Sequence, residues 1–339
     1  LLSSLDVKIG ESKEKNLTDN TMPGRMFIQK FLRRAVKARC EYALVEVTSE
    51  GVAMSRHRFI KWGMGAMTNL APEHIEAHGS FEKYRAAKEK FLRSVYDDSG
   101  KIFLNGDDQV SSWFKNIFTG ERVAWFSKKE LNQLFGFIDK NNYLFSNEFN
   151  QENLAAVVLI AKSLGISHQI IQKTIADFSG VPGRMEFVQR KPFGVVVDYA
   201  HTPDSLKKVY ENLLGASAGK LICVLGSAGG GRDRWKRPKI GEIAGRFCSE
   251  IILTNEDPYD ENPSQILLEI KSGISRTQFI ISNLFEILDR RSAIQKAVSL
   301  AQAGDTVMIT GKGSEPYIHL ERGRKMPWSD RGVVEEILK

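Results

Sequence analysis

The chain has 339 residues, 42% of them hydrophobic and 26% charged, and its 48 Lys and Arg against 41 Asp and Glu give a formal charge of +7. This composition excludes disordered and fibrous classes, and the length indicates two domains that each bury a core of their own. The longest apolar stretch with a helical pattern, 154–161, falls far short of the roughly 18 residues that a membrane-spanning helix needs. We therefore expect a globular protein without a membrane span.

The cysteines and the first residues bear on where the protein resides. Cys40, Cys223 and Cys248 are too few and too scattered for a disulfide framework, and no CxxC pair exists to hold a metal. Leu1 is followed by neither the basic nor the apolar part of a signal peptide. We expect a cytoplasmic protein whose chain is truncated at its start. The positive residues are spread along the chain without an aromatic-interleaved stripe, which argues against a nucleic-acid partner.

The first half of the chain mixes helical and extended patterns. Apolar residues at helical spacing predict helices at 24–38, 80–95 and 152–163. Short apolar runs predict strands at 43–47, 64–70, 101–105 and 122–126. The stretch FSGVPGR at 178–184 has the Gly and Pro punctuation of a connecting segment. We place the domain boundary there, between residues 180 and 181.

From about residue 194 onward, apolar runs alternate with amphipathic segments. This alternation predicts βαβ units and a doubly wound, Rossmann-like α/β domain whose parallel sheet is covered on both faces. The predicted strands lie at 194–200, 221–226, 250–255, 278–282 and 305–311, and the predicted helices around 204–214, 238–247, 264–274 and 290–302. Ligands of such sheets bind beyond the carboxyl ends of the strands. The candidate site loops are therefore DYAHTPD, GSAGGGRDRWKRP, NEDPYDENP and GKGSEPY.

The segment EHIEAH at 73–78 invites comparison with a zinc-binding helix. His74 and His78 stand four residues apart, as two metal ligands on one helix face would. In the HExxH motif a Glu directly follows the first His, whereas Ile75 takes that place here. A metal role and a plain exposed or capping role both stay open for these histidines.

Lys88 stands on the apolar stripe of the helix predicted at 80–95. Tyr84, Phe91 and Val95 recur at helical spacing, and Lys88 shares their face. Its methylenes can pack while the ammonium reaches water. Alternatively, burial lowers its pKa until the amine is neutral enough to react or to be carbamylated. Glu46, at the end of the apolar run ALVEV, is the matching carboxylate candidate, although a Glu at a strand end is usually only a polar exit.

The loop after the run LICVLG combines glycines with four cations. It lacks the Lys-Ser/Thr of the P-loop and the GxGxxG order of the dinucleotide fingerprint. A flexible glycine loop with cations at the carboxyl end of a strand favours an anionic ligand. A solvated basic loop is the alternative. The four cations are Arg232, Arg234, Lys236 and Arg237.

Taken together, these motifs resemble the Mur ligase family of ATP-dependent amide-forming enzymes in peptidoglycan precursor synthesis. Within it, they resemble the ligases that add the third peptide residue to UDP-N-acetylmuramoyl-L-alanyl-D-glutamate through an acyl-phosphate. A cyanophycin-type peptide ligase and a catalytically inactive nucleotide-binding homologue are the alternatives. The segments that carry the resemblance follow the order of the family: EVTSEGVAMSRHR (46–58), TNLAPEHIEAHGSFEKYRAAKEKF (68–91), FNQENLAA (149–156), GVPGRMEFV (180–188), DYAHTPDSL (198–206), GSAGGGRDRWKRPKIGEIA (226–244), TNEDPYDENP (254–263) and GKGSEPY (311–317).

The resemblance implies a fold, two domains and a set of site residues. It implies a partial central P-loop-type ATPase domain at 1–180 that lacks its P-loop, and a C-terminal domain at 181–339 with amino-acid and nucleotide contacts. A monomer is expected, with a UDP-N-acetylmuramoyl dipeptide and a free amino acid as partners, and ATP and Mg2+ as cofactors. The implied roles are magnesium binding and catalysis for Glu46, His74 and a carbamylated Lys88; ATP binding for Asn153, Arg184, Asp198 and His201; UDP-sugar peptide binding for Thr21, Thr48 and Arg56; and amino-acid binding for Glu256, Asp257, Tyr259, Gly311 and Glu315.

The chain also departs from the pattern of the family. Residues 1–339 contain no GxxxxGK[ST] motif, and the UDP-binding N-terminal domain is absent. Glu50 and Ser314 stand where the family usually has His, and Met22 replaces a Thr. Tyr259 stands where ligases that use meso-diaminopimelate have the Arg of a DNPR loop. We therefore expect this chain to be inactive by itself, and lysine or another diamino acid to be the acceptor.

Overall fold

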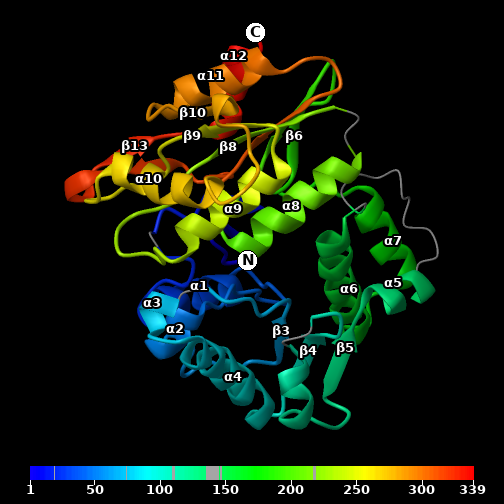
Figure 1. Ribbon diagram of the computed structural model, residues 1–339. Coiled ribbons are helices and arrows are strands. Elements are labelled where there is room, and N and C mark those ends of the chain that lie inside the picture. The colour runs from blue at the N-terminus through cyan, green and yellow to red at the C-terminus, as the bar shows by residue number, and fades with distance from the viewer. Residues whose placement is uncertain (19, 74, 109–110, 135–144, 146, 217–218) are drawn as a thin grey trace. The chain divides into compact units, whose positions relative to one another are not determined.

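The computed structural model describes residues 1–339 except 19, 74, 109–110, 135–144, 146 and 217–218 (Figure 1). The chain forms two compact units, Leu1–Asp177 and Phe178–Lys339. The division falls three residues before the boundary predicted from the sequence. No helix among the described residues is long and apolar enough to cross a membrane.

The second unit is built on a six-stranded sheet with the order β10-β9-β8-β11-β7-β6. Five strands are parallel, and only β6 runs antiparallel to its neighbour β7. The central strands are buried on both faces, which is why they read as continuous apolar runs. The bounds are β6 Glu186–Gln189, β7 Gly194–Val197, β8 Leu221–Leu225, β9 Glu250–Leu253, β10 Leu284–Glu286 and β11 Thr306–Ile309.

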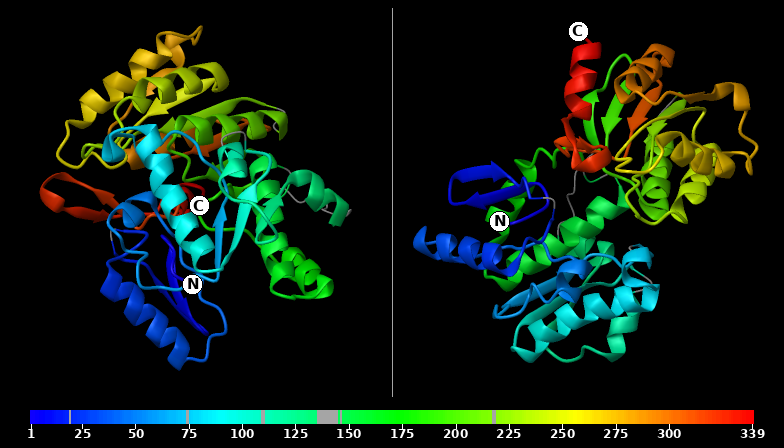
Figure 2. Two further views of the ribbon diagram at one scale, coloured as in Figure 1. Left: turned by 90° about the horizontal axis from the view of Figure 1, so that it is seen from below. Right: turned by 90° about the vertical axis from the view of Figure 1, so that its left-hand side faces the viewer.

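Helices cover both faces of this sheet (Figure 1, Figure 2). One face packs against α11 (Arg290–Leu300) and α12 (Asp330–Ile337), through side chains such as Ala293, Ile294 and Val334. The other face is covered by α8 (Pro203–Ala216), α9 (Lys236–Phe247) and α10 (Pro263–Ile274). The predicted doubly wound α/β fold is thereby confirmed.

One strand of the second unit was predicted in the wrong place. The run 278–282 is not a strand, because 281–283 forms a 3-10 turn and the edge strand β10 follows it. Ile280 and Ile281 are 65% and 52% exposed. Leu284 and Phe285 instead pair with β9. An apolar run at a sheet edge does not reveal which of its residues enter the sheet.

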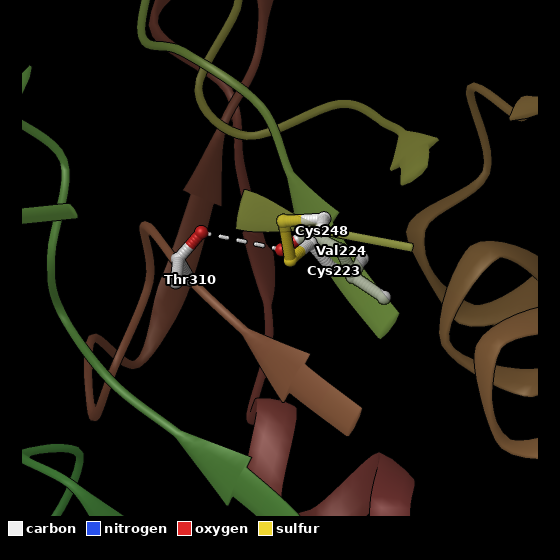
Figure 3. Close-up of a disulfide and its surroundings, with 4 residues drawn as sticks. All are labelled: Cys223, Val224, Cys248 and Thr310. Atoms are coloured by element: carbon white, nitrogen blue, oxygen red, sulfur yellow. Dashed lines mark hydrogen bonds between the residues drawn. A yellow bond between two sulfur atoms is a disulfide. The ribbon is translucent and has the colours of Figure 1, made fainter. Parts of the chain in front are cut away.

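The features of the second unit that were not predicted from the sequence include the strand β6, the helix α12, a small hairpin and a disulfide. A small antiparallel hairpin, β12 (Tyr317–His319) with β13 (Lys325–Pro327), follows the GKGSEPY loop. Cys223 on β8 and Cys248 after α9 form a disulfide with a Cα–Cα distance of 6.0 Å (Figure 3). From the sequence we predicted only that three scattered cysteines form no disulfide framework, and this single bridge was not foreseen. The pair meets because α9 returns the chain to the sheet beside the strand that it left.

The first unit contains a three-stranded parallel sheet, β3 (Met64–Met67), β4 (Lys101–Asn105) and β5 (Val123–Phe126). Successive residues of β4 point to opposite faces. Ile102 and Leu104 join the core formed with α4 (Phe81–Asp97), whereas Phe103 joins the core formed with α6 (Glu148–Ser163). The helices and the strands predicted at 64–70, 101–105 and 122–126 are thus present, with small shifts of their ends.

The strand predicted at 43–47 is absent from this sheet. Only Val45 forms an isolated bridge, with Leu2, while Leu44 stays 64% exposed. Val45 and Val47 pack against a small cluster that includes Leu2 and, from α1 (Arg25–Lys37), Ile28 and Phe31. The remaining elements of the unit are β1 Asp6–Ile9 and β2 Ser12–Lys15, which form an unpredicted hairpin, α1 Arg25–Lys37, α2 Ser49–Ala53, α3 Ile75–His78, α5 Lys128–Leu134 and α7 His168–Ala176.

Candidate functional site

The loops that follow β7, β8, β9 and β11 meet at one edge of the second unit. They do so because the carboxyl ends of parallel strands share an edge. The adjacent strands β8 and β11 lie at the centre of the sheet, with β9 and β7 on either side. The four loops chosen from the sequence therefore form one candidate site.

Lys312 stands at the centre of this site. Its side chain is fully buried, and its Nζ lies 2.9 and 2.8 Å from the two carboxylate oxygens of Asp257 and 2.6 Å from Glu315 Oε2. Burial alone would lower the pKa of Lys312, but the carboxylates of Glu315 and Asp257 outweigh it and raise the pKa. Tyr199 donates its hydroxyl to the other oxygen of Glu315 at 3.0 Å. Two predicted amino-acid contacts, Asp257 and Glu315, thus share one buried cation.

Gly311 packs against the side chain of Glu256. A Cβ at Gly311 would lie 2.1 Å from Glu256 Oε2, and its φ of +102° suits glycine. Glu256 is 5% exposed, and burial, followed by the neighbouring Asp257 charge, raises its pKa. Gly226 at the end of β8 meets the same loop, since a Cβ there would lie 2.5 Å from the carbonyl of Thr254. Both glycines let the loops approach closely.

Tyr259 is held in an uncommon backbone conformation with φ of +50°. Its ring stacks on His319, with centroids 5.0 Å apart and planes 19° apart. A Cβ on Gly230 would lie 2.8 Å from the tyrosine ring. Arg232 donates from Nη2 to the Tyr259 hydroxyl at 3.3 Å. The tyrosine that replaces an expected arginine is therefore fixed between a histidine and the glycine loop.

Arg234 and Arg237 of the glycine loop form ion pairs with glutamates on or just before α10. Arg237 is fully buried and pairs with Glu261 and Glu269 at 3.0 and 2.8 Å. It also donates to the Ala228 carbonyl at 3.0 Å. Arg234 reaches Glu269 at 2.8 Å. These contacts hold the loop against the start of α10, whereas Arg232 contacts Tyr259.

The loop after β7 brings three predicted nucleotide contacts into one neighbourhood. Asp198 is buried and accepts backbone N–H bonds from Met185 and Ala200, both at 2.6 Å. Burial raises the pKa of Asp198, although these two bonds act in the opposite direction. Arg184 lies over the Tyr199 ring at 4.2 Å, and the ring of His201 lies 4.7 Å from the same tyrosine.

Three predicted UDP-sugar contacts are close together in the first unit. The hydroxyl of Thr48 caps α2 by accepting from Gly51 N at 3.1 Å. A Cβ on Gly51 would lie 3.0 Å from that hydroxyl and 2.5 Å from Met22 Sδ, next to Thr21. Arg56 donates from Nη1 to the carbonyl of Met22.

Two of the three predicted metal ligands, Lys88 and Glu46, lie among the described residues. Lys88 is half-buried, with its Nζ 5.1 Å from the Tyr84 ring centroid. Burial lowers the pKa of Lys88, and the charges of Glu73 and Asp108 offset this only in part. Glu46 is exposed and accepts from Ser4 N at 2.7 Å.

The other two predicted residues of the first unit lie elsewhere. His74 lies outside the described residues. Asn153 is exposed on α6. Within the described part of the chain, no group of three His, Cys, Asp or Glu side chains could hold a metal ion.

Several residues that build the site were not predicted from the sequence. Tyr199 and Lys312 lie within the quoted segments DYAHTPD and GKGSEPY but were not singled out. Their positions directly after apolar strands were the available signal. His319 lies in the unpredicted hairpin, and Arg290 begins a helix on the far side of the sheet from α9. No sequence pattern points to either of these two.

Comparison with known proteins assigns both units. Residues 2–171 match the Mur ligase middle domain, and residues 183–313 match the glutamate ligase domain of Mur ligases. The chain belongs to the Mur ligase family. The predicted family and enzyme class, ATP-dependent amino-acid ligases, are thereby confirmed.

Curated Mur ligases align along almost the whole chain. UDP-N-acetylmuramoyl-L-alanyl-D-glutamate–2,6-diaminopimelate ligase of Thermosynechococcus vestitus is 34% identical over 95% of this chain and 68% of its own length. The same-named ligase of Aquifex aeolicus is 35% identical, over 94% and 67%. The UDP-N-acetylmuramyl-tripeptide synthetase of Borreliella burgdorferi is 35% identical, over 96% and 67%. The chain thus spans about two thirds of each relative.

Solved structures agree with this assignment. A UDP-N-acetylmuramoyl-L-alanyl-D-glutamate–2,6-diaminopimelate ligase superposes with a TM-score of 0.55 and 27% identity, over 98% of this chain and 72% of its own. A MurF ligase from Thermotoga maritima in complex with ADP superposes with a TM-score of 0.54 over 90% of this chain and 69% of its own. At 14% identity, the second likeness shows the fold alone.

Proposed function

We propose that this Mur ligase adds an amino acid to UDP-N-acetylmuramoyl-L-alanyl-D-glutamate in peptidoglycan precursor synthesis, using ATP. The observation that carries the proposal is the buried cluster of Lys312, Asp257 and Glu315 at the carboxyl ends of the strands. Its supporting context is the similarity to relatives whose names state that substrate. We propose the cytoplasm as its location and a monomer as its state.

The residue types suit the chemistry of such a ligation. ATP phosphorylates the substrate carboxylate, and the amine of the incoming amino acid attacks the acyl-phosphate and releases phosphate. Each step develops charge on oxygen that cations stabilise. Arg184 and His201 lie beside Tyr199, where they can meet a nucleotide phosphate. In this proposal Asp198 orients that loop through its two backbone bonds, and Asn153 is a further nucleotide contact.

The amino-acid subsite is proposed beside Lys312. Glu315 and Asp257 offer carboxylate oxygens to an ammonium, and Arg232 offers a guanidinium to a carboxylate. In this proposal Glu256 and Gly311, which pack closely against each other, also face the amino acid. A zwitterionic amino acid fits a subsite that presents both signs of charge.

We also propose roles in the first unit. Thr21, Thr48 and Arg56 contact the UDP-sugar peptide. The neutral amine of Lys88, whose pKa burial lowers, attacks carbon dioxide and releases one proton, which leaves a carbamate anion. The carbamate oxygens and Glu46 would supply oxygen ligands of the kind that Mg2+ prefers, with His74 as a nitrogen ligand, and a bound magnesium would neutralise phosphate charge.

The decisive test is a ligation assay with the complete gene product that contains this chain. The protein is incubated with ATP, Mg2+, the UDP-muramoyl dipeptide and single amino acids, and the tripeptide product is detected by mass spectrometry. Phosphate release that requires both the dipeptide and an amino acid supports the proposal. Activity on an aspartate polymer alone would indicate a cyanophycin-type ligase. Nucleotide binding without turnover on any acceptor would indicate an inactive homologue.

A further inference from the structure

The guanidinium of Arg290 is buried where two of the site loops leave the sheet. Arg290 is 2% exposed, and its Nε and Nη2 each donate to a carboxylate oxygen of Asp330 at 2.8 Å. Nη2 also donates to the carbonyl of Thr310 at 2.8 Å, and Nη1 donates to the carbonyl of Asn255 at 3.2 Å. One side chain therefore binds the first residue of α12 and the backbone of two loops.

These two carbonyls directly precede the proposed amino-acid contacts. Asn255 comes before Glu256 and Asp257, and Thr310 comes before Gly311 and Lys312. The strands β9 and β11 are not neighbours, because β8 lies between them. No ladder hydrogen bond can join the two strand ends directly. The guanidinium of Arg290 bridges this gap behind the site.

We propose that Arg290 is a positioning residue of the amino-acid subsite, which sets the spacing between the loop at 255–257 and the loop at 310–312. This inference rests on the proposed function and deepens it. The spacing matters for two contacts between these loops. Lys312 must reach the carboxylate of Asp257, and Gly311 must pack against the side chain of Glu256. A planar guanidinium is suited to this role, since it holds several acceptors in fixed directions.

Asp330 provides the charge that lets a guanidinium stay buried. Its two oxygens face Arg290, and Trp328 Nε1 donates to Asp330 Oδ1 at 2.7 Å. Trp328 is in turn tied to the GKGSEPY loop, because its backbone N–H donates to the carbonyl of Pro316 at 2.9 Å. The start of α12 is therefore joined to the site at two points.

The neighbouring Arg291 offers a matched control. It is exposed, and it joins the same two helices through Glu336 at 2.6 Å. The structure gives it no hydrogen bond to either loop among the described residues. A change at Arg291 therefore tests the α11–α12 contact, whereas the same change at Arg290 tests the loops as well.

The experiment compares Arg290→Lys with Arg291→Lys in the complete gene product, in the ligation assay described above. We expect Arg290→Lys to raise the KM for the amino acid at least tenfold while the KM for ATP changes less than twofold. Arg291→Lys is expected to leave both values unchanged. An unchanged amino-acid KM in a folded Arg290→Lys enzyme, with only a lower Tm, would overturn the inference.

Hydrogen exchange gives a readout that does not need turnover. Peptides covering 254–258 and 310–315 should exchange faster in Arg290→Lys and in the milder Trp328→Phe, and at the wild-type rate in Arg291→Lys. Unchanged exchange in both loops would contradict the inference even if ligation were impaired. A wild-type enzyme that ligates no amino acid would instead refute the proposed function, which separates the two failures.

Discussion

Lys312 and Asp257 form a buried ion pair in which one ammonium contacts both oxygens of one carboxylate, at 2.9 and 2.8 Å. The lysine side chain is fully buried and that of the aspartate is 7% exposed. Asp257 Oδ1 also accepts the backbone N–H of His319 at 2.8 Å. This pair joins the loop after β9, the loop after β11 and the β12–β13 hairpin.

Lys312→Met should destabilise the protein and impair ligation. It leaves the Asp257 carboxylate buried without its cation, which costs about 3–5 kcal/mol. The control is Lys271→Met, which removes an ion pair with Glu286 whose side chains are 37% and 35% exposed, and which should cost less than about 1 kcal/mol. Urea unfolding of both variants measures the difference. Equal losses would contradict the buried pairing.

The same pair predicts a pH dependence. The pKa of Lys312 is raised in the folded state. Its contribution to stability is therefore fully present below the unfolded value of about 10.4 and is lost as the pH rises through the folded pKa above it. The difference in unfolding free energy between wild type and Lys312→Met should be constant from neutral pH to about pH 10. A difference that already disappears below pH 9 would show that the pair does not form.

Gly311→Ala should be much more harmful than Gly304→Ala. Both glycines have positive φ, of +102° and +92°, so both substitutions carry the backbone strain of an L-residue, about 1–2 kcal/mol. Only at Gly311 does the new Cβ meet a side chain, at 2.1 Å from Glu256 Oε2, which adds about 1–3 kcal/mol of overpacking. Thermal unfolding of the two variants isolates that addition. Matching Tm values would argue against the close contact.

Lys88→Met should stabilise the fold at neutral pH and abolish ligation. Because burial lowers the pKa of Lys88, the folded state bears the cost of an ammonium below its folded pKa. That cost fades as the pH rises toward the unfolded value of about 10.4, so the advantage of the variant should shrink over the same range. Tm is measured in carbonate-free buffer, with the exposed Lys90→Met as control. Full ligation activity of Lys88→Met would refute the proposed carbamate.

The acceptor amino acid should be lysine or another diamino acid in preference to meso-diaminopimelate. The phenol of Tyr259 lacks the bidentate fork that an arginine offers to a distal carboxylate. Parallel assays with L-lysine and meso-diaminopimelate measure the preference, and Tyr259→Arg should shift it toward meso-diaminopimelate, whereas Tyr259→Phe should not. A strong wild-type preference for meso-diaminopimelate would overturn this expectation.

Cys223 and Cys248 should form one disulfide, and Cys40 should remain a free thiol. Thiol titration of the unfolded, unreduced protein should give one thiol per chain, and three after reduction. Closing a loop with a sequence separation of 25 stabilises by about 3 kcal/mol in the chain-entropy treatment. Reduction should therefore lower the Tm. Three thiols before reduction would exclude the bridge.

From the sequence alone we predicted the buried parallel strands of the second unit and the edge that carries the site, but not the edge strand β6. Strands buried on both faces are apolar without interruption, so β7, β8, β9 and β11 could be recognised, and chain direction places their following loops together. The position of β10 was predicted wrongly, because an edge strand contributes few buried residues. The apolar residues Ile280 and Ile281 were included in the predicted strand, although both are exposed. The family was likewise readable from motifs along the chain.

The pairing of the charges, in contrast, could be read only from the folded structure. In the sequence, Arg232, Arg234, Lys236 and Arg237 form one basic loop. In the folded protein, Arg237 on α9 forms ion pairs with Glu261 and with Glu269 on α10. Lys312 meets Asp257 over 55 residues, and Arg290 meets Asp330 over 40. Such contacts depend on which strands are neighbours and on the depth of each side chain, and neither quantity is encoded in local spacing.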